Sequence, residues 1–183
     1  MTKRIPKSQS SSRLPHKDAH LRTATDYIEF DLKSLIAALH LYVQHKGTPI
    51  GNAAVDSLLV RSRVLIDFLF AVSPKLDDVV ASDFFHDSPS MTYSPRLTKS
   101  LSQERQKINK RLMHLTTQPM PHLRSNQRYA IDKIVPPIVR ALEVWLAAVP
   151  DTRIQKPASR SRAQLEAHLA QLKQMVPRRT RHK

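Results

Sequence analysis

Apolar residues recur at helical spacing in five stretches of the chain, and this pattern predicts an all-α fold. The stretches cover about residues 26–43, 52–72, 94–119, 125–149 and 162–176. The segments between them are polar or contain proline, which is typical of connections between helices. We therefore expect a four- or five-helix bundle over about residues 25–150, followed by a basic extension.

Residues that start and stop helices mark the predicted boundaries. Asp26 and Glu29 have the spacing of a capping box, so we expect the first helix to begin near Asp26. Gly47 and Pro49 are typical of a helix stop, and Asn52 is expected to cap the second helix. These signals predict a helical hairpin in the first half of the chain.

The third and fourth helices carry signals of their own. Ser94 as a cap with Pro95 in the first turn predicts the start of the third helix. Pro136–Pro137 is expected to interrupt the fourth helix, because proline has no amide hydrogen to donate. Trp145, in the second half of that helix, is expected to anchor the core.

The connection over residues 73–94 is rich in aspartate. Its aspartates are Asp77, Asp78, Asp83 and Asp87. Their spacing matches no calcium loop, and the glycine that such a loop needs for its turn is missing, so capping and solvation are the expected roles. Phe84 and Phe85 in the same segment are expected to plug the end of the bundle.

Both ends of the chain are basic. Residues 1–24 are polar and contain prolines without helical periodicity, which predicts a disordered tail. Residues 151–183 predict a second basic extension around one amphipathic helix, with Leu165, Leu169 and Leu172 in register. We expect that helix to dock on the bundle, to bind a partner or to dimerise.

The composition excludes several classes of function. The chain has only two glycines, whereas phosphate-cradling loops need several, and it has no cysteine for thiol chemistry or Cys-ligated zinc. No apolar run approaches the roughly 18 residues that a membrane span requires. We expect a cytoplasmic protein with no cofactor, no metal site and no membrane contact.

The positive charge is unevenly placed along the chain. The net charge is +15, and residues 96–183 hold nineteen Lys and Arg against five Asp and Glu. Residues 26–95 instead hold five Lys and Arg against nine Asp and Glu. Clustered cations attract a polyanion and release its counterions on binding, so this asymmetry favours nucleic acid as a partner.

One arc of the third helix collects most of the candidate site. At 100° per residue the arc spans roughly 120°. It lies beside the apolar stripe of the same helix, which is formed by Leu97, Leu101, Ile108, Leu112 and Leu115. The members of the arc are Arg96, Lys99, Lys107, Lys110, Arg111 and His114. A row of cations on one helix face can follow a phosphate backbone, and the terminal Arg178, Arg179 and Arg181 are expected to add contacts.

Three motifs resemble a widespread bacterial family of small helical proteins with HEPN-like features. The motifs are RSRVLIDFLF, DDVVASDFF and INKRLMHLT, within about residues 52–117. HEPN-like domains are helical bundles, often dimeric, and many are metal-independent ribonucleases with an arginine four to six residues ahead of a histidine. The resemblance implies that His114 is a general acid or base, whereas Asn109, Ile108 and Lys107 stand at the arginine spacings.

These observations leave three functional hypotheses open. The first is a nucleic-acid-binding accessory or regulatory protein, with RNA favoured, that contacts phosphates through the third-helix arc and the tails. The second is a divergent HEPN-like ribonuclease that uses His114. The third is a protein-interaction module that acts through the C-terminal helix, with either a different protein or a second copy of the chain as the partner.

Overall fold

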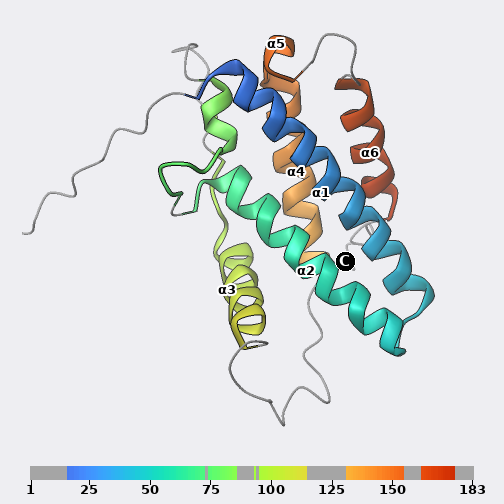
Figure 1. Cartoon of the computed structure of the whole chain (residues 1–183). Coiled ribbons are helices and arrows are strands. Elements are labelled where there is room, and N and C mark those ends of the chain that lie inside the picture. The colour runs from blue at the N-terminus through green and yellow to red at the C-terminus, as the bar shows by residue number, and fades with distance from the viewer. Residues whose placement is uncertain are drawn as a thin grey trace, which may run out of the picture.

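The computed structural model describes residues 16–72, 74–85, 93, 95–114, 131–154 and 162–175, and within them the protein is all-α. The helices are α1 (Asp18–Gln44), α2 (Pro49–Phe70), the 3₁₀ turn η1 (Ala81–Phe85), α3 (Lys99–His114), α4 (Ile131–Ala148), α5 (Asp151–Ile154) and α6 (Arg162–Met175). Figure 1 shows α1 and α2 as a hairpin in front of α4, with α6 beside α1 and α3 at the lower side. The prediction of a helical bundle is confirmed.

The first helix begins at Asp18, so the predicted start near Asp26 and the tail boundary at residue 24 are wrong. The side chain of Leu21 is fully buried, and the Thr25 hydroxyl donates to the Leu21 carbonyl at 3.1 Å. Burial of these early turns extends the helix past the polar capping box, whose Asp26 and Glu29 lie inside α1. The predicted disorder of residues 1–15 lies outside the described residues.

The α1–α2 turn has the predicted stop but a different cap. Gly47 has a φ of 85°, a conformation that glycine adopts without a steric penalty. Thr48, and not Asn52, caps α2, since its hydroxyl accepts from the Gly51 amide at 3.2 Å. Pro49 at the first helical position costs no hydrogen bond, because the first amides of a helix have no partner within the helix.

Two predictions about the later helices are also corrected. The third helix begins at Lys99, where the Thr98 hydroxyl accepts from the Leu101 amide at 3.2 Å, and the predicted cap Ser94 lies outside the described residues. The fourth helix continues through Pro136 and Pro137. Its neighbouring turns bury apolar side chains against α2 and α6, and this packing holds the helix together where hydrogen bonds are missing.

Aromatic side chains cluster in the core, and the predicted core position of Trp145 is confirmed. Trp145 is 1% exposed, and its ring meets those of Phe84 and Phe68 edge to face, with centroids 5.1 Å and 5.4 Å away. Phe85 is also buried and stacks on Tyr93. The η1 turn therefore closes one end of the bundle.

The C-terminal elements pack on the bundle, which is the first of the three alternatives expected for the C-terminal helix. The predicted register of α6 is confirmed, since Leu165, Leu169 and Leu172 are buried where α6 packs on α1 and α4. Arg162 donates to the carbonyls of Leu146 and Val149, which satisfies acceptors at the end of α4. Apolar burial and this cap fix α6 to the bundle.

A buried arginine joins three elements at the closed end of the bundle. Arg153 of α5 is 7% exposed in its side chain. It donates to the Phe84 carbonyl of η1 and lies 3.3 Å from an Asp18 carboxylate oxygen of α1. This contact places η1 and α5 on the first turn of α1.

Candidate nucleic-acid interface

The core fixes the orientation of α3, the most basic of the helices. Leu101 and Ile108 are fully buried, and Arg105 binds Asp67 of α2 through Nε at 2.6 Å. The helix carries five Lys and Arg against one acid, Glu104. With its apolar side packed on α2 and α4, α3 presents Lys99 and Lys110 to solvent.

The predicted arc on α3 is only partly assembled. Lys99, Lys107 and Lys110 are exposed on the helix, whereas Arg96 precedes it because α3 begins at Lys99. Arg111 and His114 lie on α3, but their side chains are outside the described part of the structure. The terminal Arg178, Arg179 and Arg181 are outside it as well, so the roles predicted for these five residues stay predictions.

Lys107 is partly neutralised by a residue that the arc did not include. Its ammonium lies 2.8 Å from Oε1 of Glu104, whose side chain is 5% exposed. A buried carboxylate needs a partner of opposite charge, so Lys107 is held to this pair and is less available to an external phosphate. Lys99 and Lys110 remain as the exposed lysines of α3 that pair with no described acid.

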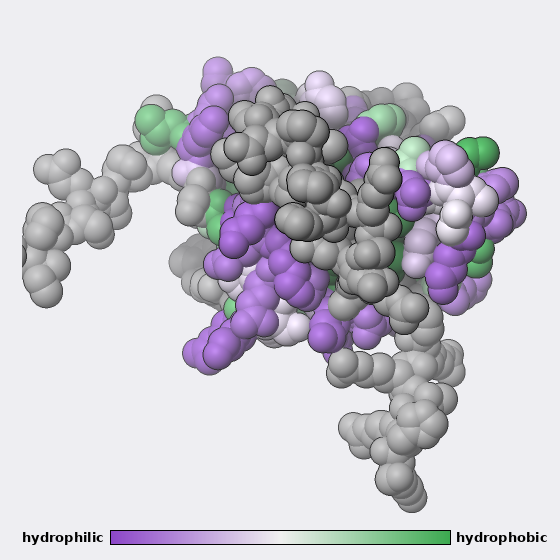
Figure 2. Space-filling view, turned by 90° about the horizontal axis from the view of Figure 1, so that it is seen from below, coloured by the Kyte–Doolittle hydropathy of each residue, from purple (hydrophilic) through white to green (hydrophobic). Residues whose placement is uncertain are grey.

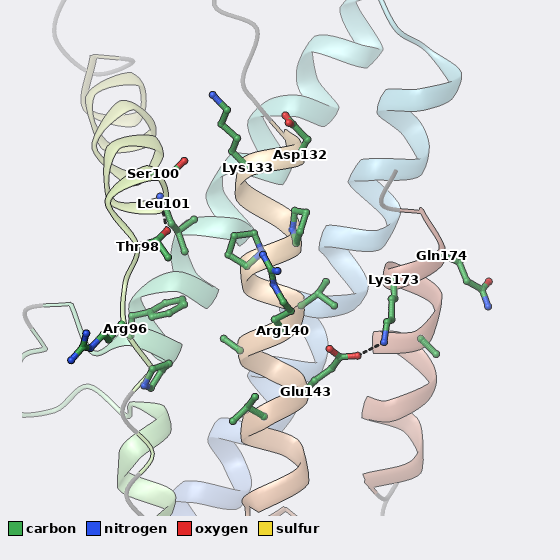
Figure 3. A pocket seen from close by; sticks show the side chains of 18 residues that line it. Arg96, Thr98, Ser100, Leu101, Asp132, Lys133, Arg140, Glu143, Lys173 and Gln174 are labelled. Carbon is green, nitrogen blue, oxygen red and sulfur yellow. Dashed lines mark hydrogen bonds and ion pairs between the residues drawn. The ribbon is translucent and has the colours of Figure 1, made fainter. Parts of the chain in front are cut away.

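A groove of about 1400 Å³ opens between α3, α4 and α6. Its floor is the outer face of α4, including Pro136, Pro137 and Val144. One wall is the start of α3 with the segment before it, and the other is α6 (Figure 3). Tyr93 fixes the segment before α3, because its buried hydroxyl donates to the Ala141 carbonyl at 3.1 Å.

Tyr93 stays a neutral hydrogen-bond donor over the ordinary pH range. Burial raises the pKa of its phenol well above the usual value of 10.0. Proton loss would leave a charged oxygen in the core beside the Ala141 carbonyl. The α3 wall is therefore held in place without a titration near neutral pH.

Two cations of α4 line the groove, and neither was predicted from the sequence as a site residue. Lys133 and Arg140 are exposed and lie seven residues apart, which places them on the same side of a helix. Figure 3 shows Lys133 extending toward the α3 side and Arg140 lying over the middle of α4. Together with Arg96 they form three groove cations, none of which pairs with an acid among the described residues.

The α6 wall is close to neutral. Lys173 of α6 binds Glu143 of α4 across the groove edge at 2.6 Å (Figure 3). Gln174 follows Lys173 and adds an amide that can both donate and accept hydrogen bonds. The floor also carries one exposed acid, Asp132, beside Lys133. Among the described lining residues of the floor and the α3 side, the cations Arg96, Lys133 and Arg140 therefore outnumber the acids by three to one, and most of the excess positive charge of the groove lies there.

The surface around α3 is strongly hydrophilic. Seen from below, hydrophilic side chains gather on the side of the molecule where α3 lies (Figure 2). The far end of the α1–α2 hairpin instead exposes Leu41, Val43 and Ile50. The two ends of this face therefore differ in character.

The aspartates of the connection act as local caps. The Asp78 carboxylate accepts from the Lys75 amide at 2.7 Å, and that of Asp83 accepts from the Val80 amide at 2.8 Å. The predicted capping role is confirmed for both, whereas Asp87 lies outside the described residues. Within the described part of the chain, His, Asp and Glu side chains form no group of three or more that could hold a metal ion.

The helices that the structure describes include none that is long and apolar enough to cross a membrane. Comparison of the chain with protein-family models, with curated proteins and with solved structures finds no match.

Proposed function

We propose that the protein binds nucleic acid, with RNA favoured, in an accessory or regulatory role. The observation that carries this proposal is the groove beside α3, where Arg96, Lys133 and Arg140 share one concave surface without acidic partners among the described residues. RNA is favoured because the three sequence motifs resemble HEPN-like domains. Lys99 and Lys110 extend the basic surface along α3.

The energetic basis of the proposal is the phosphate charge of the ligand. Each Lys or Arg that neutralises a phosphate releases condensed counterions, and this term dominates binding that is independent of sequence. Arg96 and Arg140 can also present two parallel N–H groups to one phosphate. Lys133 and Arg140 have no acidic partner among the described residues, so no ion pair with these residues is lost on binding, which supports both as contacts.

The charge distribution supports a directional contact. α1 carries four acids against two Lys and Arg, whereas α3 carries five Lys and Arg against one acid. Asp18, Glu29 and Asp31 of α1 are paired with Arg153, Lys33 and Arg61, so α1 neither attracts nor strongly repels a polyanion, whereas one approaching α3 meets net attraction. The groove side is therefore favoured.

The test is a gel-shift series with labelled single-stranded RNA, run from low to high salt without added metal. We expect binding by the unchanged protein to weaken as salt rises, and the double variant Lys133→Glu, Arg140→Glu to lose at least ten-fold in affinity. The matched control is Lys46→Glu, Lys75→Glu, which changes the net charge equally at exposed sites outside the groove.

Three outcomes would decide against the proposal. The absence of a gel shift at low salt would show that the protein does not bind the single-stranded RNA used in the test. Equal losses in the groove and control variants would show that the attraction is general and that the groove is not the site. RNA cleavage that disappears in His114→Ala would support a ribonuclease instead.

A further inference from the structure

The groove floor has two different surfaces along one helix. Lys133 and Arg140 are about 10 Å apart along α4, since a helix rises about 1.5 Å per residue. Between them lie Pro136 and Pro137, and beyond Arg140 the side chain of Val144 is 60% exposed. Lys133 and Arg140 thus border an apolar surface. Its two prolines carry no backbone N–H group that would need a hydrogen-bond partner.

The walls of the groove also differ. Arg96, Thr98 and Ser100 line the α3 side, which adds a guanidinium and hydroxyl groups to the floor cations. On the α6 side, Lys173 is paired with Glu143, and Ala170 and Gln174 complete the lining. Phosphates are attracted to the cations of the α3 side, whereas the nearly neutral α6 side can accommodate uncharged groups.

A nucleic-acid duplex fits this surface poorly. Proteins that read a DNA duplex insert a protruding helix or β-ribbon into its major groove, which is about 12 Å wide, and proteins that bind an RNA duplex contact its wide, shallow minor groove and its phosphates. Here the two α4 cations lie on the floor of a concave surface between α3 and α6. A duplex would contact the flanking helices first, whereas a single strand can lie along the floor.

We propose that the groove binds a single strand, with its sugar–phosphate backbone along the α3 side and its bases on the apolar floor toward α6. This inference rests on the proposed function. The groove lining contains one aromatic residue, the partly buried Phe70, so base stacking contributes little. Binding is therefore weakly sensitive to base sequence, with the Gln174 amide as the polar contact to base edges.

The first test compares competitors for a labelled twelve-nucleotide RNA strand bound to the whole protein. The competitors are the unlabelled strand, the DNA strand of the same sequence and the RNA duplex of the same length. We expect both single strands to compete at least ten-fold better than the duplex. Equal or better competition by the duplex would overturn the single-strand inference.

The second test places the bases directly. RNA containing 4-thiouridine is crosslinked by light, and the modified tryptic peptides are identified by mass spectrometry. We expect crosslinks in peptides 141–153 and 163–173, which carry Val144 and Ala170. Crosslinks confined to residues 97–105 would reverse the proposed orientation.

The two proposals fail in different ways. If no strand binds, or if Lys133→Glu, Arg140→Glu binds normally, the proposed function of the groove is wrong. If that variant is defective but duplex competes as well as single strand, the groove is the site and only the single-strand inference is wrong.

Discussion

At the scale of single residues, Arg153 shows how a buried cation can organise several elements. Its guanidinium contacts the Phe84 carbonyl and the Asp18 carboxylate, and its own carbonyl lies 3.5 Å from the Thr25 hydroxyl. The Asp18 side chain is 50% exposed, so water partly screens that charge pair. The buried carbonyl of Phe84 depends more strongly on Arg153.

We expect Arg153→Ala to lower the free energy of unfolding by about 2 kcal/mol, because it leaves a buried acceptor unsatisfied. Urea unfolding at neutral pH measures the change. The matched control is Arg22→Ala, which removes an exposed hydrogen bond to the Thr152 carbonyl of the same short helix. A loss no larger than that of the control would contradict the proposed role of Arg153.

Residue periodicity predicted the core better than the charged contacts. Leu101 and Ile108 of the predicted stripe are fully buried, because burial of one helix face depends mainly on local spacing. The Glu104–Lys107 pair and the groove position of Arg140 depend on how α3 and α4 pack, which local spacing does not give. A search for cations seven residues apart on the predicted fourth helix would have found Lys133 and Arg140.

At the scale of elements, the ends of helices were the least predictable features. Several residue types can cap a helix, and tertiary burial decides among neighbouring candidates. Burial of Leu21 extended α1 to Asp18, and Thr48 took the cap that Asn52 was expected to form. The sequence therefore predicted which segments are helical more accurately than where each helix begins.

The two prolines divide α4 into parts of unequal stability. Pro136 and Pro137 donate no hydrogen bond, so the carbonyls of Asp132 and Lys133 have no amide donor four residues ahead. Only the amides of Val135 and of residues after Pro137 can connect the first turn to the rest of the helix.

The first four amides of any helix have no acceptor within it, so the informative amides are those of Val135 and Ile138, which flank the prolines. We expect these two amides to exchange with deuterium at least ten-fold faster than those in residues 140–146, which lie on the turns around Trp145. Hydrogen-exchange mass spectrometry or NMR measures the difference. The N-terminal turns of α2 serve as the comparison, because that helix has a proline only at its start. Uniform protection along α4 would show that packing fully compensates for the missing hydrogen bonds.

At the scale of the whole molecule, the fold separates charges that alternate along the chain. The acidic α1 and the basic α3 have few contacts with each other, and α2 lies between them in the packing order. This arrangement keeps the excess positive charge of α3 beside the groove on α4. A ligand held by that charge must respond to salt in proportion to the number of cations that it contacts.

Neutralising two groove cations therefore has a quantitative consequence. For a single strand, the slope of log K against log salt changes by about 0.7 for each phosphate contact. If Lys133 and Arg140 each contact one phosphate, the double variant Lys133→Gln, Arg140→Gln should have a slope less steep by about 1.4. Fluorescence anisotropy at several salt concentrations measures both slopes.

The control Lys46→Gln, Lys75→Gln removes the same charge at exposed sites outside the groove and should leave the slope unchanged. Because a general effect of net charge would alter both variants alike, a change confined to the groove variant would identify Lys133 and Arg140 as phosphate contacts, and parallel changes would exclude them.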